Sequence, residues 1–407
     1  MSRRHPNNTS SKRIDGGVTT MNFDEQLANA ILKKVAQVAQ ERHLDEEGIK
    51  DLIDTAVHAA YVDGPKVMAD GMVKQLMQQI PEMVEQERTL RTAFEQRLQA
   101  RWQKALDLFD STVILTREAG ERFSQKHREH VVKDKNALIE ALVRIHIRAC
   151  QTAAAVSVLL KSGFARDALA RQRTLHELAV VAFLLKEHGT PLAERFLLHE
   201  VIETCTAAEQ YESAYARLGY DPPDPANLAY ARAKRDRLCQ RFGKAYKNNY
   251  GWAADVIGKE RPTFEDLEKA AHLNHLRPYY RMAGYGVHAT AKGMVFDIGN
   301  ITIDPNEPRG LLAGASNAGL ADPGHGTLLS LYQCTVTLLT SRSDVEPLAS
   351  LHTLKSFVDE AGQAFLDIHR EILEEEKQRT NSTQAHETDV FSSNTPGRDC
   401  ILPMIDS

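Results

Sequence analysis

The sequence predicts an all-α protein, and three observations favour that fold class. Apolar residues recur every three to four positions through most of the chain, which is typical of amphipathic helices. Aromatic residues make up only 6% of the 407 residues, which disfavours an aromatic-rich β-sandwich. Hydrophobic residues reach 42%, so the chain can bury a core.

Composition also excludes several classes of protein. The 50 basic and 55 acidic residues give a net charge of -5, which argues against a surface that is basic throughout and coats nucleic acid. The five cysteines form no CxxC pair, so neither a structural zinc site nor a disulfide framework is expected. The sequence contains no dinucleotide, P-loop, serine-hydrolase or HExxH motif. We therefore expect no metal and no cofactor.

Charge and hydropathy divide the chain into five predicted segments. Residues 1–20 read as a flexible arm and 380–407 as a flexible tail, because both are polar and without periodicity. Residues 21–135 read as an N-terminal helical extension, 136–342 as a helical core and 343–379 as a C-terminal helix. No apolar run reaches 18 residues and no signal peptide is evident, so we expect a cytoplasmic protein without a membrane span.

The helices of the extension follow from apolar stripes over 22–130, interrupted by the turn Gly64-Pro65. Within this range, 83–123 is long and highly charged, with apolar residues at three-to-four spacing. That pattern suits either half of a coiled coil or an amphipathic helix that packs on the next domain.

Helices of the core are delimited by glycine, proline and capping residues. Residues 137–160 form one predicted helix, which Gly163 ends, and 164–188 form the next, which Gly189 ends. Thr190-Pro191 begins a third, and a basic helix is predicted over 226–247 after the proline-rich 221–225. Thr263 with Asp266 indicates a capping box.

The last part of the core contains the single strong β signal. A helix is predicted over 279–292, followed by a small β-hairpin over 295–303 whose turn is Gly299-Asn300. A glycine-rich loop then leads to an apolar helix over 327–339.

Arg281 and His288 form the first candidate site. If 279–292 is helical, seven residues turn through about 700°, so the two side chains share a face about 10 Å apart along the axis, with Tyr285 between them. Arginine supplies a fixed cation and histidine a group that exchanges a proton near neutral pH. Metal-free RNA cleavage needs such a pair. The alternative is an arginine and a histidine at an ordinary helix end.

Arg173 and Glu177 form the second candidate, four residues apart on a helix that is apolar nearly all round after Glu177. Such a helix is central in a fold, and a charged stripe on it needs partners. We therefore expect this stripe to face the Arg281/His288 face. The alternative is an exposed ion pair.

A basic segment over 228–261 is the third candidate. It contains nine basic and three acidic residues, together with Tyr246, Tyr250 and Trp252. Cations beside aromatic rings suit single-stranded RNA, and the predicted RNA-binding residues are Arg235, Arg241, Lys244, Tyr285 and Trp252. The alternative is a solvated helix face.

Two of these motifs resemble known families. The motif Arg173-Thr-Leu-His-Glu177, then Trp252, then Tyr280-Arg281-x6-His288 resembles a bacterial family known only as a domain of unknown function, over about 136–342. That family often has serine where this chain has Gly284. The later motif is also similar to the Arg-x4-6-His signature of the HEPN superfamily, which consists of all-helical, usually dimeric domains. Many HEPN domains are metal-independent ribonucleases in toxin–antitoxin and phage-defence systems.

The HEPN resemblance implies a homodimeric endoribonuclease with His288 as general acid/base and Arg281 as transition-state cation. Arg173 and Glu177 would orient them. It also implies RNA as substrate and an antitoxin or defence protein as partner. Two alternatives remain: a non-catalytic helical adaptor that binds another protein, and a nucleotide or small-ligand sensor.

Overall fold

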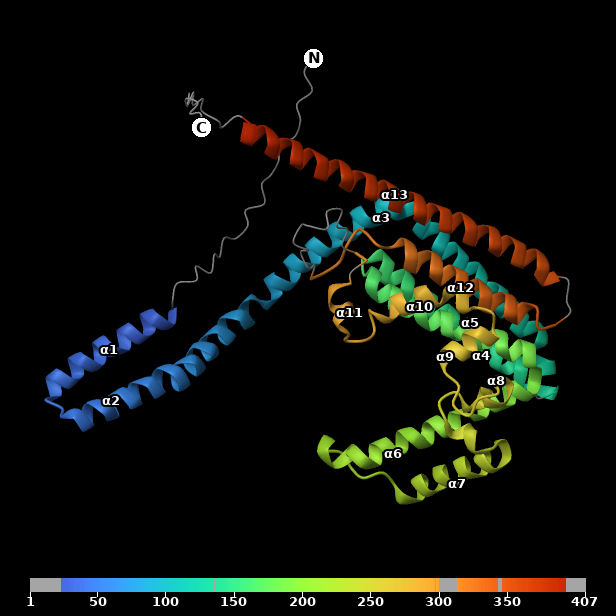
Figure 1. Ribbon diagram of the computed structural model, residues 1–407, viewed down its shortest axis with the longest axis horizontal. Coiled ribbons are helices and arrows are strands. Elements are labelled where there is room, and N and C mark those ends of the chain that lie inside the picture. The colour runs from blue at the N-terminus through green and yellow to red at the C-terminus, as the bar shows by residue number, and fades with distance from the viewer. Residues whose placement is uncertain (1–22, 135, 297, 300–312, 343–345, 393–407) are drawn as a thin grey trace, which may run out of the picture. The chain divides into compact units, whose positions relative to one another are not determined.

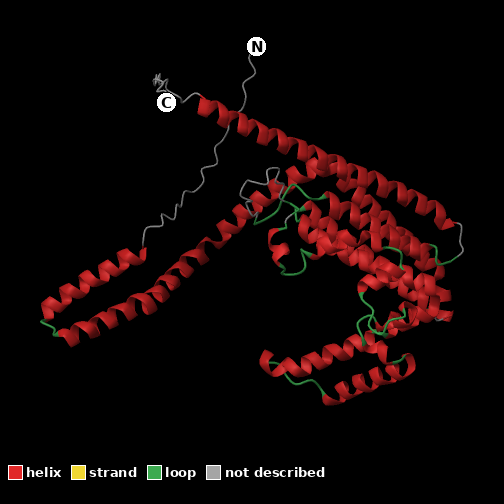
Figure 2. Cartoon of the chain, in the orientation of Figure 1, coloured by secondary structure: helices red, strands yellow, loops and turns green. Residues whose placement is uncertain are grey.

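A computed structural model describes residues 23–134, 136–296, 298–299, 313–342 and 346–392 (Figure 1). Every regular element within these ranges is helical, and none of these residues forms a strand (Figure 2). The prediction of an all-α chain is therefore confirmed. The longer helices are α1 (Phe23–Arg42), α2 (Glu46–His58), α3 (Gly64–Asp134), α4 (Ala137–Lys161), α5 (Ala165–Leu198), α6 (Glu200–Leu218), α7 (Pro225–Phe242), α12 (Ala321–Leu339) and α13 (Glu346–Ser392).

Short helical elements connect α7 to α12. They are η2 (Lys244–Lys247), η3 (Gly251–Ala253), α8 (Ala254–Ile257), α9 (Phe264–Ala270), η4 (Asn274–Leu276), α10 (Arg277–Gly284) and α11 (Ala291–Val295). A π-helical turn, η1 (Ala59–Asp63), joins α2 to α3.

The chain forms two compact units, residues 1–91 and 92–407. The division falls inside α3, whereas the sequence placed it at 135/136. Leu98, Trp102 and Phe109 on the later part of α3 are almost fully buried and belong to a core cluster of the second unit. Trp102 packs 5.9 Å from Phe365 of α13, centroid to centroid. These contacts explain why that part of α3 belongs to the second unit.

The centre of the second unit is formed by α4, α5 and α12, which contact one another extensively. By length and composition alone α4 could cross a membrane, but the core helices of soluble proteins meet the same criteria. Eleven of its 25 residues are buried. The sequence indicated the break at Gly189, where the backbone leaves helical geometry at φ 71° and kinks α5. It also indicated the Thr263–Asp266 capping box, which begins α9.

Three predictions about local structure need correction. The helix predicted over 279–292 ends at Gly284 as α10, and α11 begins separately at Ala291. The β-hairpin is not confirmed, because Val295 ends α11 and residues 298–299 form a turn; its second arm, from Asn300, lies outside the described residues. The C-terminal helix extends to Ser392 instead of 379, while the arm over 1–20 also lies outside the described residues.

Candidate functional site

Polar side chains at three positions along α5 contact the segment that contains α10, directly or through a shared carboxylate. Arg166 donates hydrogen bonds to the carbonyl oxygens of Tyr285, at 3.3 Å, and of Gly293. Arg173 contacts Tyr280 one level along the helix, and His176 binds the carboxylate that also pairs with Arg277. The charged stripe on α5 therefore contacts the segment that contains Arg281 and His288, through residues other than these two.

Arg173, Tyr280 and Glu177 form a closed polar network. Arg173 Nη2 donates to the Tyr280 hydroxyl at 2.6 Å, and this hydroxyl donates to Glu177 Oε1 at 2.8 Å. Arg173 Nε also donates to Glu177 Oε1 at 3.3 Å, and its guanidinium lies 4.1 Å from the centroid of the Tyr280 ring. Burial, helped by the Glu177 carboxylate, raises the pKa of Tyr280. The hydroxyl is therefore a neutral donor that fixes both charged groups.

Glu268 of α9 binds α10 through Arg277. Its side chain is 0% exposed and accepts from His176 Nε2 at 2.8 Å and from Arg277. Burial lowers the pKa of His176 although Glu268 opposes that shift. A carboxylate in this position needs both partners, because an unpaired buried charge is strongly unfavourable.

Gly284 of α10 lies next to Arg173. A Cβ at Gly284 would lie 2.7 Å from Arg173 Nη1, so the missing side chain makes room for the guanidinium. Arg281 precedes Gly284 by three residues and His288 follows it by four. The amide of His288 donates to the Gly284 carbonyl at 3.1 Å, so the turn after α10 continues helically for these residues.

The single helix face that was predicted to carry both Arg281 and His288 ends at Gly284, because His288 lies beyond α10 and not within it. Both side chains are exposed. Neither makes an ion pair or hydrogen bond with another residue in the described part of the chain. Both side chains are open to solvent, while Arg173 and Glu177 of α5 are bound to each other and to Tyr280.

The predicted RNA-binding segment is partly neutralised by carboxylates of the same chain, including at two of the predicted RNA-binding arginines. Arg235 pairs with Glu209 of α6 at 2.9 Å, and Arg241 pairs with Glu194 of α5 at 2.8 Å. Trp252 is 3% exposed and packs on Phe196 in the core. Its ring is thus not open to a base.

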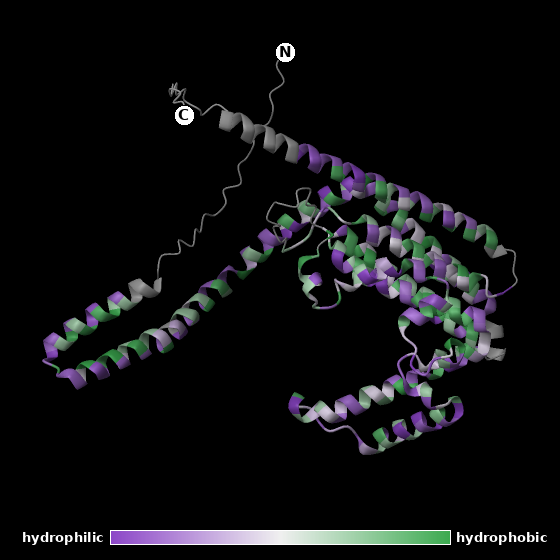
Figure 3. Cartoon of the chain, in the orientation of Figure 1, coloured by the Kyte–Doolittle hydropathy of each residue, from purple (hydrophilic) through white to green (hydrophobic). Residues whose placement is uncertain are grey.

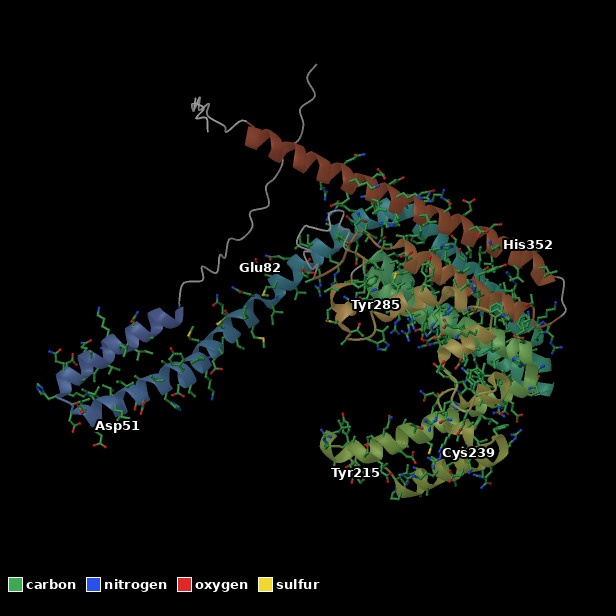
Figure 4. All side chains as sticks on the ribbon, in the orientation of Figure 1. Asp51, Glu82, Tyr215, Cys239, Tyr285 and His352 are labelled. Carbon is green, nitrogen blue, oxygen red and sulfur yellow. The ribbon has the colours of Figure 1, made fainter. Side chains whose placement is uncertain are left out.

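Lys244 and Tyr285 differ from these three residues. Lys244 is exposed at the start of η2. Tyr285, which Figure 4 labels, is partly buried, with its ring 5.3 Å from that of Phe296 and Lys292 Nζ 4.8 Å from its centroid. Of the five predicted RNA-binding residues, Lys244 and Tyr285 retain some access to solvent without a carboxylate partner among the described residues.

Comparison with known proteins finds a family model that matches the central part of the chain. Residues 139–302 match the model of a family of unknown function, DUF5677. The DUF5677 match begins in α4 and contains the polar network, Arg281 and His288. The resemblance to a domain of unknown function is therefore confirmed over this range, which is narrower than the predicted 136–342. No curated protein and no solved structure matches the chain.

Sequence reasoning missed two residues that build the site. Tyr280 was read as part of a motif, but its hydroxyl is the bridge between Arg173 and Glu177. Glu268 carried a usable signal, because Phe264, Leu267, Glu268 and Ala271 share one buried stripe of a short helix. A charge on an apolar stripe indicates a buried partner.

Proposed function

We propose that this protein is a metal-independent endoribonuclease with a HEPN-like helical core, in which Arg281 and His288 act on the RNA backbone. One observation carries the proposal. Gly284 lies against Arg173, and the exposed Arg281 and His288 stand three residues before it and four residues after it along the chain. A fixed cation and a titratable imidazole are thereby present on one short segment of the chain, next to a network that holds this segment to α5.

The chemistry needs two groups at one phosphodiester. His288 accepts the proton of the 2′-hydroxyl, and the 2′ oxygen attacks the adjacent phosphorus. Arg281 stabilises the extra negative charge of the pentacovalent phosphorane. The bond to the 5′ oxygen then breaks, and the imidazolium proton is available to that oxygen. The products are a 2′,3′-cyclic phosphate and a 5′-hydroxyl.

Arg173 and Glu177 act as positioning residues in this scheme. Their bonds to Tyr280 fix α10 relative to α5, and their partly buried side chains have partners already. RNA would be held by exposed cations, including Lys244, with Tyr285 between Arg281 and His288 in the chain. Arg235, Arg241 and Trp252 have structural roles in this proposal.

Replacement of the two groups tests the proposal. His288→Ala and Arg281→Ala should each slow RNA cleavage by roughly 10² to 10⁴ and relieve any growth toxicity. Circular dichroism should stay unchanged, because both side chains are exposed. His352→Ala is the matched control, since His352 is an exposed histidine on α13, labelled away from Tyr285 in Figure 4. Cleavage by His288→Ala at the wild-type rate would reject the proposal.

A second candidate function, a helical assembly module, is favoured by the N-terminal unit. Val73, Leu76, Ile80, Met83 and Leu90 of α3 follow heptad spacing, and each is at least 46% exposed. Residues of high hydropathy, coloured green, recur along this part of α3 (Figure 3). Such a seam is the pattern of a coiled coil, and apolar surface of this extent marks an interaction site.

The occupant that we propose is a second copy of the chain. The residues that flank the seam between Val73 and Glu87 are Met77, Gln79, Val84 and Gln86. None is charged, so no like-charge repulsion arises at these flanking positions, and Glu87 is the one charged residue at a seam position. A homodimer of this kind serves the adaptor hypothesis and is equally compatible with a dimeric ribonuclease.

Light scattering on the full chain tests this surface. Wild type should be dimeric at micromolar concentration, and Leu76→Glu with Ile80→Glu should give monomers, because the charges would be buried in the seam. Gln78→Glu adds a charge on the same helix outside the seam and should leave the dimer intact. A monomeric wild type, or a dimer that survives the double substitution, would exclude self-pairing through α3.

A further inference from the structure

A pocket of about 400 Å³ lies between α5, α10, α12 and α13 in the second unit. Its size falls at the lower end of the range for small-molecule sites. Leu169, Leu276, Leu329 and Leu366 form apolar walls. Tyr280 belongs both to this lining and to the Arg173–Tyr280–Glu177 network, so the pocket adjoins that network, and His176 of the lining binds Glu268 of α9.

Gln172 is the side chain that points to a ligand. It lines the pocket, is 7% exposed, and its Oε1 is buried without a hydrogen-bond donor among the described residues. Buried amides are nearly always paired, because an unpaired one costs about 1–3 kcal/mol. Gly326 faces it, since a Cβ there would lie 3.2 Å from Gln172 Nε2. Glycine at position 326 thus lets the Gln172 side chain pack closely against α12, while its Oε1 stays without a donor among the described residues.

The remaining polar groups determine the charge of the ligand. None of the described lining residues is lysine or arginine, while Asp322 contributes a carboxylate. Burial lowers the pKa of His325, which keeps its ring neutral at pH 7. Ser330 adds a hydroxyl, and Tyr279, 54% exposed, adds an aromatic ring. An anionic ligand is disfavoured, and a neutral, planar ligand with N–H donors is favoured.

We propose that this pocket binds an adenine ring, with Gln172 pairing to its amino edge. A glutamine amide offers one donor and one acceptor side by side, which match the N7 and N6 amino group of adenine. Asp322 can accept a further N–H, the leucine walls enclose the ring, and Tyr279 can stack on it. The phosphate of a nucleotide would have to stay outside, because the pocket offers it no cation.

The adenine can come from free adenosine or from a base of single-stranded RNA. Binding does not depend on cleavage, so the proposal stands apart from the ribonuclease chemistry. Its test uses ligands that cannot be cleaved: adenosine, uridine, and two 2′-O-methyl hexanucleotides, one all-uridine and one with a single central adenine.

Isothermal titration calorimetry on the full chain measures the affinities. Either adenosine should bind more tightly than uridine, or the adenine-containing hexanucleotide more tightly than the all-uridine one, by at least about tenfold. A preference among the nucleosides indicates a free ligand, and a preference confined to the hexanucleotides indicates RNA. No adenine preference in either pair would overturn the proposal.

Gln172→Leu supplies the second test, with a readout that separates binding from folding. Loss of the amide pair should weaken adenine binding by roughly 10- to 100-fold. The variant should resist urea at least as well as wild type, because it removes a buried polar atom without a partner. Gln333→Leu is the matched control: Gln333 Oε1 of α12 is also buried without a partner among the described residues, but it lies outside the pocket lining. Undiminished binding by Gln172→Leu would overturn the assignment.

Discussion

Replacement of Glu268 by alanine should be the most destabilising single change near the candidate site. Its carboxylate is 0% exposed and is held by His176, 2% exposed, and by Arg277, 24% exposed. Glu268→Ala leaves Arg277 with only the partly exposed Glu265 as counter-charge, and it leaves the buried His176 ring without its hydrogen-bond partner. Breaking a buried pair in this way costs about 3–5 kcal/mol, a large share of the 5–15 kcal/mol typical for a folded domain.

Tryptophan fluorescence during urea unfolding reports this change selectively. The chain has two tryptophans, and Trp102 and Trp252 are both buried in the second unit. Glu265→Ala is a matched control on the same helix, because Glu265 also pairs with Arg277, at 3.0 Å, but its side chain is 36% exposed. Its loss should shift the midpoint little, since exposed pairs are screened. Equal midpoints for the two variants would refute the idea that Glu268 anchors α10.

Three further predictions concern the same unit. Burial lowers the pKa of His146 to about 4. The free energy of unfolding should therefore be at its full value above pH 6.5 and fall by on the order of 3 kcal/mol toward pH 4. The urea midpoint of His146→Gln should fall less steeply with pH than that of wild type, and an equal pH dependence would contradict the prediction. Gly284→Ser should displace the flexible end of Arg173, slowing cleavage with little change in melting temperature; an unchanged rate would count against the network. Tyr280→Phe should lower the free energy of unfolding by about 1 kcal/mol and should also slow cleavage. A cleavage rate that Glu177→Gln changes and Tyr280→Phe does not would contradict this prediction.

Local signals predicted much of the fold. The all-α class, the kink at Gly189 and the capping box at Thr263 each depend on residues within one or two helical turns. The hairpin prediction depended on the β propensity of 295–298, which the helix capped by Thr290 overrides at Val295. Strand propensity is sensitive to context, so this segment could not be assigned from its own residues.

Site residues were predictable where their spacing is local and not where their partners are distant. The Arg173–Glu177 spacing indicated a polar stripe, but Tyr280 joins it from more than 100 residues away. Likewise, the positive charge of 228–261 looked available for RNA because its acidic partners, such as Glu194 and Glu209, precede it on other helices. Only the tertiary structure reveals that neutralisation.

The chemistry of the RNA ends is the most direct test of the central claim that His288 and Arg281 cleave RNA through its 2′-hydroxyl. Purified full-length protein should cut single-stranded RNA in excess EDTA and leave 2′,3′-cyclic phosphate and 5′-hydroxyl ends. A single 2′-deoxynucleotide at the cleavage position should block that cut, because the attacking oxygen is missing. Ends with 3′-hydroxyl and 5′-phosphate, cleavage that persists at the 2′-deoxy position, or intact RNA would contradict the account.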